Sequence, residues 1–226
     1  MTAQRFVLPV IHHRDAATSR AQADLAFAAG ADGVFLISHE EKDEDLYDPA
    51  QMIKASHPER KVGVNFLTMN AREAFAMTML LRLDMAWLDA PGISSAGIDR
   101  RAHDLDRLLQ RMGSTPQVFA SVAFKYQPVD SDPPAAAVAA YRLGMVPTTS
   151  GDATGSSPAV EKIAAMRAAL PQAAPLAIAS GMTPENVGDY LPYVSHILVA
   201  TGVSRDEHHF DEDKLRRFVQ EVRRFG

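Results

Sequence analysis

Short apolar runs alternate along this chain with longer segments in which apolar residues recur at helical spacing. Apolar runs of strand length bounded by glycine or polar residues predict β-strands, and a period near 3.6 residues predicts helices. The predicted strands are residues 6–11, 33–37, 61–66, 85–89, 117–124, 145–148, 176–181 and 196–199. The predicted helices are residues 16–29, 49–56, 70–83, 99–112, 134–143, one opening at Pro158, one opening at Pro184, and 213–224.

Regular strand–helix alternation predicts an α/β fold with a parallel sheet and crossover helices. Eight such units within 226 residues fit the size of the (β/α)₈ barrel, the TIM barrel. No change of composition marks a linker, so we expect a single barrel domain over residues 1–226. In a closed barrel residues 6–11 would lie beside residues 196–199. A doubly wound open sheet, in which these two strands lie apart, is the alternative.

Composition narrows the functional classes. The chain has no cysteine, which excludes disulfides, a thiol nucleophile and thiolate metal sites. A net charge of −5 argues against nucleic-acid binding, which requires a basic surface. No apolar run has the length of a membrane span and the N-terminus lacks a signal-peptide pattern, so we expect a cytoplasmic protein without membrane insertion.

Three late turns are rich in glycine and hydroxyl side chains and suit a phosphate group. Glycine lets a ligand approach backbone N–H groups closely, and a helix opening at Pro184 would add further donors and a positive helix end. In (β/α)₈ barrels a phosphate often binds at the loops after the last two strands. The alternative is that these are packing turns. The candidate phosphate-binding residues are Ser150, Gly151, Thr154, Gly155, Ser180, Gly181, Thr201 and Gly202.

The same turns resemble the BtpA family, through the segments Thr149–Gly155, Ala179–Val187, Val199–Gly202 and Gly30–Ile37. The resemblance is strongest from Met145 onward. It implies a barrel of the ribulose-phosphate-binding class, alongside phosphoribosylanthranilate isomerase and the tryptophan synthase α subunit. The family is associated with photosystem I biogenesis and with phosphoribosyltransferase-like activity. The proline-rich segment that the family usually carries after its first strand is missing here.

Catalytic groups of such barrels lie at the carboxyl ends of the strands, which form the open end that we call the mouth. Side-chain alternation puts Asn65 on the face of Gly63, and Lys125 on the face of Ser121, opposite the bulky aliphatic residues. We therefore expect both Asn65 and Lys125 to face the mouth, with Asp89 at its rim.

Each of these three candidates has a functional and a structural interpretation. Lys125 can form a Schiff base or act as a fixed cation, or it can extend past the strand into solvent. Asn65 can orient a substrate hydroxyl or carbonyl, or close a turn. Asp89 can be a general base, or it can close an Asx turn before Pro91.

His13 and His39 are further mouth candidates, although His12 and His13 must point in opposite directions, so at most one of them lines the mouth. His39 precedes an acidic segment from Glu40 to Asp48. Carboxylates in such a run can bind a divalent cation, but a charge run is more often a solvated loop. We predict no metal and no cofactor.

Two functions remain open from the sequence. The first is an enzyme that acts on a phosphorylated sugar or phosphoribosyl compound, as a phosphosugar isomerase or lyase or as a phosphoribosyltransferase-like enzyme. The second is a non-catalytic binding or assembly factor that keeps the barrel and the phosphate pocket. The expected ligand in both is a phosphorylated small molecule. The sequence does not identify the reaction, the exact substrate or whether the chain forms a homo-oligomer.

Overall fold

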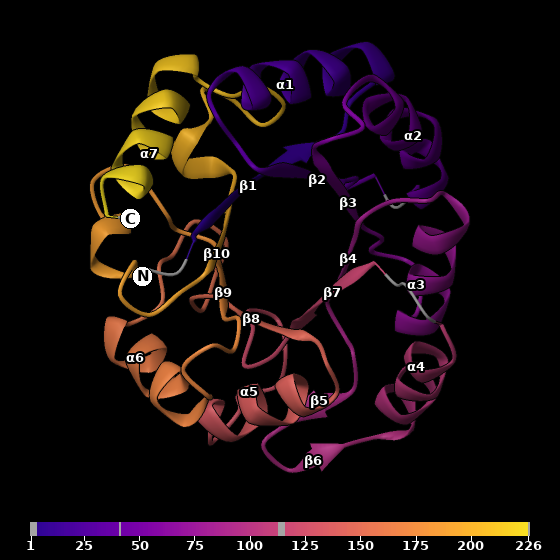
Figure 1. The fold of residues 1–226 in the computed structure, drawn as a ribbon, viewed down its shortest axis with the longest axis vertical. Coiled ribbons are helices and arrows are strands. Elements are labelled where there is room, and N and C mark those ends of the chain that lie inside the picture. The colour runs from indigo at the N-terminus through magenta and orange to yellow at the C-terminus, as the bar shows by residue number, and fades with distance from the viewer. Residues whose placement is uncertain (1–3, 41, 113–115, 226) are drawn as a thin grey trace.

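The computed structural model describes residues 4–40, 42–112 and 116–225, and it shows eight parallel strands closed into a barrel inside a ring of helices (Figure 1). The strand order around the barrel is β1-β10-β9-β8-β7-β4-β3-β2. The pairing of Phe6 with His196 and of Pro9 with Val199 closes it. The predicted (β/α)₈ barrel is thus confirmed and the open sheet is excluded, while a single domain over residues 1–226 stays a prediction.

The barrel strands and the surrounding helices fall close to the predicted segments. The strands are β1 (Phe6–His12), β2 (Gly33–Ile37), β3 (Lys61–Asn65), β4 (Met85–Leu88), β7 (Gln117–Ser121), β8 (Val146–Thr149), β9 (Ala177–Ala179) and β10 (His196–Val199). The helices are α1 (Ala16–Ala28), α2 (Tyr47–Ser56), α3 (Ala71–Leu80), α4 (Arg100–Arg111), α5 (Pro133–Arg142), α6 (Val160–Ala169) and α7 (Glu212–Arg224). A short hairpin, β5 (Ile93–Ser94) with β6 (Gly97–Ile98), follows β4 and was not predicted.

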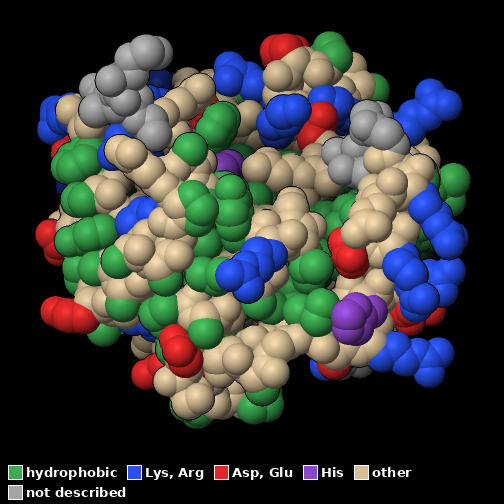
Figure 2. Space-filling model, turned by 60° about the horizontal axis from the view of Figure 1, so that its bottom comes forward, with side chains coloured by type: hydrophobic (Ala, Val, Ile, Leu, Met, Phe, Trp, Pro, Cys, Tyr) green, Lys and Arg blue, Asp and Glu red, His purple; other side chains and the backbone are tan. Residues whose placement is uncertain are grey.

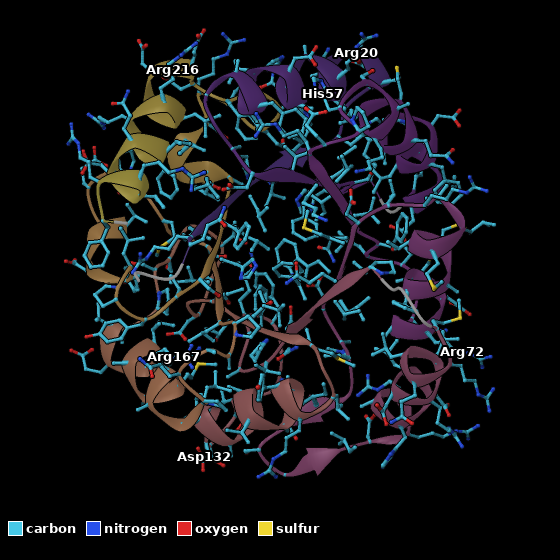
Figure 3. All side chains as sticks on the ribbon, in the orientation of Figure 1. Arg20, His57, Arg72, Asp132, Arg167 and Arg216 are labelled. Carbon is cyan, nitrogen blue, oxygen red and sulfur yellow. The ribbon has the colours of Figure 1, made fainter. Side chains whose placement is uncertain are left out.

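Side-chain caps explain where several helices begin. Asn70 and Glu73 form the predicted capping box of α3, in which each side chain bonds the other residue's backbone N–H. Asp15, Asp99 and Asp132 cap α1, α4 and α5 in the same position, and each accepts from an N–H of the first turn. The charged faces of the helices point outward, as labelled side chains of the outer ring show (Figure 3): Arg20, Arg72, Arg167 and Arg216.

Two helix predictions were wrong in the late loops. No α-helix opens at Pro184; only a 3₁₀-helix (Val187–Asp189) lies between β9 and β10. The Asn186 side chain accepts from Thr183 N and donates to Gly181 O, both at 2.8 Å, and such local bonds compete with helix formation. The helix expected at Pro158 begins only at Val160, without a side-chain cap.

The barrel interior is packed with large side chains, as is usual for this fold. Six rings contact one another in sequence along it, in the order Phe6, His196, Phe119, Phe35, Trp87 and Phe124. The Phe6–His196 contact lies at the amino ends of β1 and β10, and Trp87 and Phe124 approach the mouth. A second, larger core of mainly aliphatic residues fills the space between the strands and the helices.

Within the described ranges, no helix is long and apolar enough to cross a membrane. The cytoplasmic location stays a prediction.

Candidate functional site

A cavity at the mouth brings together most of the residues that the sequence singled out. It is bounded by the carboxyl ends of β1 and β2 on one side and by the loops after β8, β9 and β10 on the other. Its polar lining consists of His12, His39, Lys125, Thr154, Ser180 and Thr201. Six of the eight candidate phosphate-binding residues line this one cavity: Thr154, Gly155, Ser180, Gly181, Thr201 and Gly202.

The other two candidates, Ser150 and Gly151, are not among the lining residues of this cavity, and their part in phosphate binding stays a prediction. Ser150 is fully buried. Its hydroxyl donates to Gly151 O and accepts from the backbone N–H of Lys125, both at 2.8 Å. Gly151 instead lines a neighbouring hollow beside Asp152 and Lys162. Ser150 therefore positions Lys125 from outside the cavity.

The glycines of these turns have a packing role that the sequence could not show. A Cβ at Gly181 would lie 2.2 Å from Ser157 N, and one at Gly202 would lie 1.9 Å from Met182 O. These contacts are with backbone, which cannot rotate away. The three loops thus pack against one another through glycine, so the glycines alone do not identify a phosphate site.

Residues that line the cavity nevertheless carry backbone donors without an acceptor. In the described part of the chain, the N–H groups of Gly155, Gly181 and Met182 donate to no acceptor. Ser180 and Gly181 have φ angles of 72° and 70°, and this left-handed conformation is costly for Ser180. The positive helix end expected behind this turn is missing because no α-helix follows it. Any anion binding must come from turn N–H groups, hydroxyls and Lys125.

Lys125 lines the cavity, but not for the reason the sequence suggested. Strand β7 ends at Ser121, and Ala123 and Tyr126 adopt left-handed φ angles of 44° and 63°, so simple alternation does not extend to Lys125. Its Nζ donates to Thr154 Oγ1 at 3.1 Å. Burial lowers the pKa of Lys125 below its ordinary value, and Tyr126 and Asp89 oppose that shift.

Lys162 of α6 was missed by sequence reasoning, because a lysine in an amphipathic helix usually faces solvent. Here its Nζ donates to Ala123 O at 2.7 Å and to Ser150 O at 2.8 Å. Thr149 Oγ1 also donates to Ala123 O, at 3.0 Å. Lys162 therefore ties the loop that carries Lys125 to the loop after β8 and holds the strained backbone at Ala123.

Asn65 ends β3, and Asp89 directly follows the neighbouring strand β4 and lies next to Ser121. Asn65 Nδ2 donates to Trp87 O at 3.0 Å, and its Oδ1 is buried without a hydrogen-bond partner. Ser121 Oγ accepts from Trp87 Nε1 at 3.0 Å and donates to Asp89 Oδ1 at 3.3 Å. Ser121 was not predicted as a site residue, although its place at the end of a strand was a usable signal.

The surroundings of the Asp89 carboxyl favour its protonated form. Burial raises its pKa, and the hydrogen bonds from Asn65 and Ser121 and the charge of Lys125 offset the increase only in part. Gln127 Nε2 fixes the adjacent backbone by donating to Asp89 O at 2.6 Å and to Ser121 O at 3.1 Å. Asp89 is not among the cavity-lining residues; it acts on the cavity through its charge on Lys125.

Of the paired histidines it is His12, and not His13, that lines the cavity, and a mouth role for His13 stays a prediction. The His13 ring is hydrogen-bonded to Ser19 Oγ of α1, Nδ1 to Oγ at 2.8 Å. His12 packs edge-on against His39, with 4.8 Å between ring centroids, and its Nδ1 is buried without a partner. Burial, followed by the charge of His39, lowers the pKa of His12 to about 4.

The acidic segment contains a structural carboxylate. Asp43 is buried and accepts from Leu67 N, Thr68 N and Met69 N at 2.8 to 3.1 Å, and from Thr68 Oγ1 at 2.7 Å. These bonds anchor the β3–α3 loop. Within the ranges that the structure describes, which omit Glu41, no group of three or more His, Cys, Asp or Glu residues has metal-binding geometry.

Comparison with known proteins places this chain in a family. The model of the BtpA family matches residues 53–224, well over half of the sequence. The chain belongs to the BtpA family. No curated protein matches it.

Solved structures with this barrel include several enzymes whose names refer to phosphorylated compounds. Phosphoribosyl anthranilate isomerase from Thermus thermophilus has a TM-score of 0.69 at 16% identity, covering 98% of this chain and 100% of its own. The same enzyme from Thermotoga maritima has a TM-score of 0.69 at 14% identity, with 97% and 99% covered. (S)-3-O-geranylgeranylglyceryl phosphate synthase from Thermoplasma acidophilum, in complex with sn-glycerol-1-phosphate, has a TM-score of 0.69 at 14% identity, with 98% and 94% covered. At these identities the likeness shows the shared fold alone.

Proposed function

We propose that this BtpA-family barrel is an enzyme that binds a phosphorylated sugar or phosphoribosyl compound at its mouth. The observation that carries the proposal is the cavity itself, in which the three late turns meet the Lys125 amine and the His12 ring. Turn N–H groups and hydroxyls suit the phosphate oxygens, and a cation beside them favours an anion. Solved barrels of this fold that act on phosphorylated compounds are consistent with it.

The reacting end of the ligand would extend from the phosphate turns toward Lys125, Asn65 and Asp89. Asp89 is the acid–base candidate because burial raises its pKa toward the range in which a carboxyl both takes and gives a proton. Neutral His12 can bond a substrate oxygen without adding charge, since its pKa of about 4 keeps it unprotonated near neutral pH. Such groups suit an isomerase, a lyase or a phosphoribosyltransferase-like reaction.

The competing hypothesis is a non-catalytic binding or assembly factor with the same pocket. Its phosphate turns would be identical, but it would have no use for a buried carboxyl with a raised pKa beside a lysine. The Asn65–Ser121–Asp89 arrangement therefore favours the enzyme. Turnover that is lost in Asp89→Asn while ligand binding remains would decide between them.

We propose no nucleic-acid partner. Lys and Arg side chains gather along one edge of the face shown in Figure 2, with Asp and Glu among them. On α4, Arg100 and Arg107 both pair with Asp104. Such mixed charge does not make the continuous basic surface that a phosphate backbone requires.

Calorimetric titration tests phosphate binding. The best variant is Thr201→Val, which removes a cavity hydroxyl while keeping side-chain shape, whereas valine at Gly181 or Gly202 would clash with backbone and confuse binding with folding. We expect Thr201→Val to bind ribulose 5-phosphate about tenfold more weakly than wild type, the loss typical of one hydrogen bond to a charged group. Ser157→Ala, an exposed hydroxyl in the loop after β8 that is not among the cavity-lining residues, is the matched control. Equal affinity of ribulose and ribulose 5-phosphate for wild type would refute the phosphate site.

A further inference from the structure

We infer that Lys125 forms a covalent imine with the carbonyl carbon of a phosphorylated aldehyde or ketone held in the mouth cavity. The inference rests on the proposed function and narrows its ligand to compounds that carry both a phosphate and a free carbonyl group. It depends on the partners of Lys125, on its surroundings and on how its backbone is held.

The Lys125 amine has a neutral partner, whereas the amine of Lys54 is in an ion pair and that of Lys162 is occupied by two backbone carbonyls. Within the described ranges no carboxylate lies within 4.0 Å of the Lys125 Nζ, and the amine donates a hydrogen bond to the Thr154 hydroxyl. Lys54, by contrast, pairs with Asp84 at 2.8 Å. Lys162 is held by two carbonyls. An amine held by an ion pair loses that pair when it reacts, so Lys125 has less to lose than Lys54.

The surroundings of Lys125 favour the neutral amine, which is the nucleophilic form. Apolar side chains line the same cavity, among them Val10, Ile37 and Trp87. Burial lowers the pKa of Lys125, as is typical of imine-forming lysines in apolar pockets. Two groups oppose this lowering of the Lys125 pKa, Tyr126 first and Asp89 second. The Asp89 carboxyl is therefore close enough to influence the amine without forming an ion pair with it.

Lys125 is also held in place from its backbone. Its N–H donates to Ser150 Oγ, the Phe124 ring before it packs into the barrel interior, and Lys162 fixes Ala123. The loop therefore presents the amine to the cavity. Lys125 follows β7, which lies across the barrel from β1 and β2, the strands that carry and precede His12 and His39. A pre-organised nucleophile reacts faster because its orientation is fixed before the reaction.

The proposed step balances without an oxidant or reductant. The nitrogen lone pair of neutral Lys125 attacks the carbonyl carbon, and an N–C bond forms as the carbon–oxygen π bond breaks. The nitrogen then gives up a proton and the oxygen takes one up, which gives a neutral carbinolamine. The carbon–oxygen bond then breaks and the hydroxyl leaves as water, with a proton supplied by Asp89 or solvent. The product is a protonated imine, which withdraws electrons from the neighbouring carbon.

Reductive trapping tests the inference on the full chain. The protein is incubated with D-glyceraldehyde 3-phosphate, reduced with sodium borohydride and mapped by peptide mass spectrometry. Parallel samples contain D-glyceraldehyde, which lacks the phosphate, or glycerol 3-phosphate, which lacks the carbonyl. We expect the adduct on Lys125 with the phosphorylated aldehyde, its suppression by excess glycerol 3-phosphate, and no adduct on Lys162.

Two variants separate amine chemistry from charge and from background labelling. Lys125→Arg keeps the positive charge without a nucleophilic amine, so it should lose the adduct while glycerol 3-phosphate still binds in calorimetry. Lys61→Arg, at an exposed lysine, is the matched control and should keep the Lys125 adduct.

The outcomes distinguish this inference from the proposed function. Binding of glycerol 3-phosphate to wild type without any Lys125 adduct would overturn the imine and leave the phosphate site standing. Labelling spread over the exposed lysines, or equal Lys125 labelling by D-glyceraldehyde, would overturn the phosphorylated-carbonyl class. Absence of both phosphate binding and adduct would overturn both proposals.

Discussion

Two histidines at opposite ends of the barrel have the same lowered pKa, of about 4, and very different surroundings. His196, at the amino end of β10, stacks on Phe6 with 4.8 Å between ring centroids and meets Phe119 edge-on. Its Nδ1 is hydrogen-bonded to Ser195 Oγ at 2.8 Å. His12, at the carboxyl end of β1, lines a cavity and leaves its Nδ1 without a partner.

The difference extends beyond the two histidines. The two buried side-chain atoms without partners in the described part of the chain, His12 Nδ1 and Asn65 Oδ1, are both on residues that end strands at the mouth. The described residues include four non-glycine residues with positive φ. Three of them are in loops at the mouth: Ala123, Tyr126 and Ser180. Unsatisfied groups and backbone strain cost stability and tend to gather where a protein binds or reacts.

The comparison indicates that an equal pKa does not mean an equal role. At the amino end of the barrel a neutral histidine completes an aromatic stack, and the expected consequence is stability. At the mouth a neutral histidine with a free nitrogen is available to a ligand. This division follows the general separation of stability and activity between the two ends of (β/α)₈ barrels.

The largest effect should come from His196→Ala. It removes a ring packed between Phe6 and Phe119, and we expect the free energy of unfolding to fall by about 3 kcal/mol, as for other buried rings. His12→Ala borders a cavity and should cost less than about 1 kcal/mol while weakening ligand binding. Urea denaturation of both variants measures the contrast, and equal losses would contradict it.

Acid should destabilise the folded protein through His196. Its folded pKa is about 4 against 6.5 when unfolded, so its contribution is complete above pH 6.5 and is lost as pH falls through about 4. Over that window the loss reaches about 3 kcal/mol, from 1.36 kcal/mol per pKa unit. Urea midpoints at several pH values should show a smaller decline in His196→Phe than in wild type. His103→Gln, at an exposed histidine, should follow wild type, and a decline in His196→Phe as steep as that of wild type would exclude this source.

Lys162→Met should lower stability less than His196→Ala or acid does, and its effect should be at the mouth. Ser150 O loses its lysine donor and Ala123 O keeps only Thr149, so we expect a loss of about 2 kcal/mol in the free energy of unfolding. Lys61→Met, at an exposed ion pair, should change it by less than about 0.5 kcal/mol. Hydrogen exchange should show faster opening of the loop after β7 in Lys162→Met alone. Unchanged exchange would mean that Lys162 does not hold this loop.

Much of the candidate site could be anticipated because strand ends can be recognised in the sequence. Asn65 and Asp89 follow directly from the ends of β3 and β4, and the three late turns follow from the order of strands around a barrel. His12 and His13 could not be told apart from the sequence, because alternation requires only that they point in opposite directions. Lys125 was placed at the mouth by an alternation that stops at Ser121.

What the sequence by itself determined is local: apolar period, strand and helix order, the capping box at Asn70 and the closure implied by eight repeated units. What only the tertiary structure decided depends on contacts between loops distant in the chain. Lys162 reaches Ala123 across 39 positions, and Gly181 needs its small size because Ser157 lies against it. The absence of a helix after Pro184 follows from the hydrogen bonds of Asn186. Periodicity records which face of a segment is buried, whereas the partner of each polar group depends on how the segments meet in space.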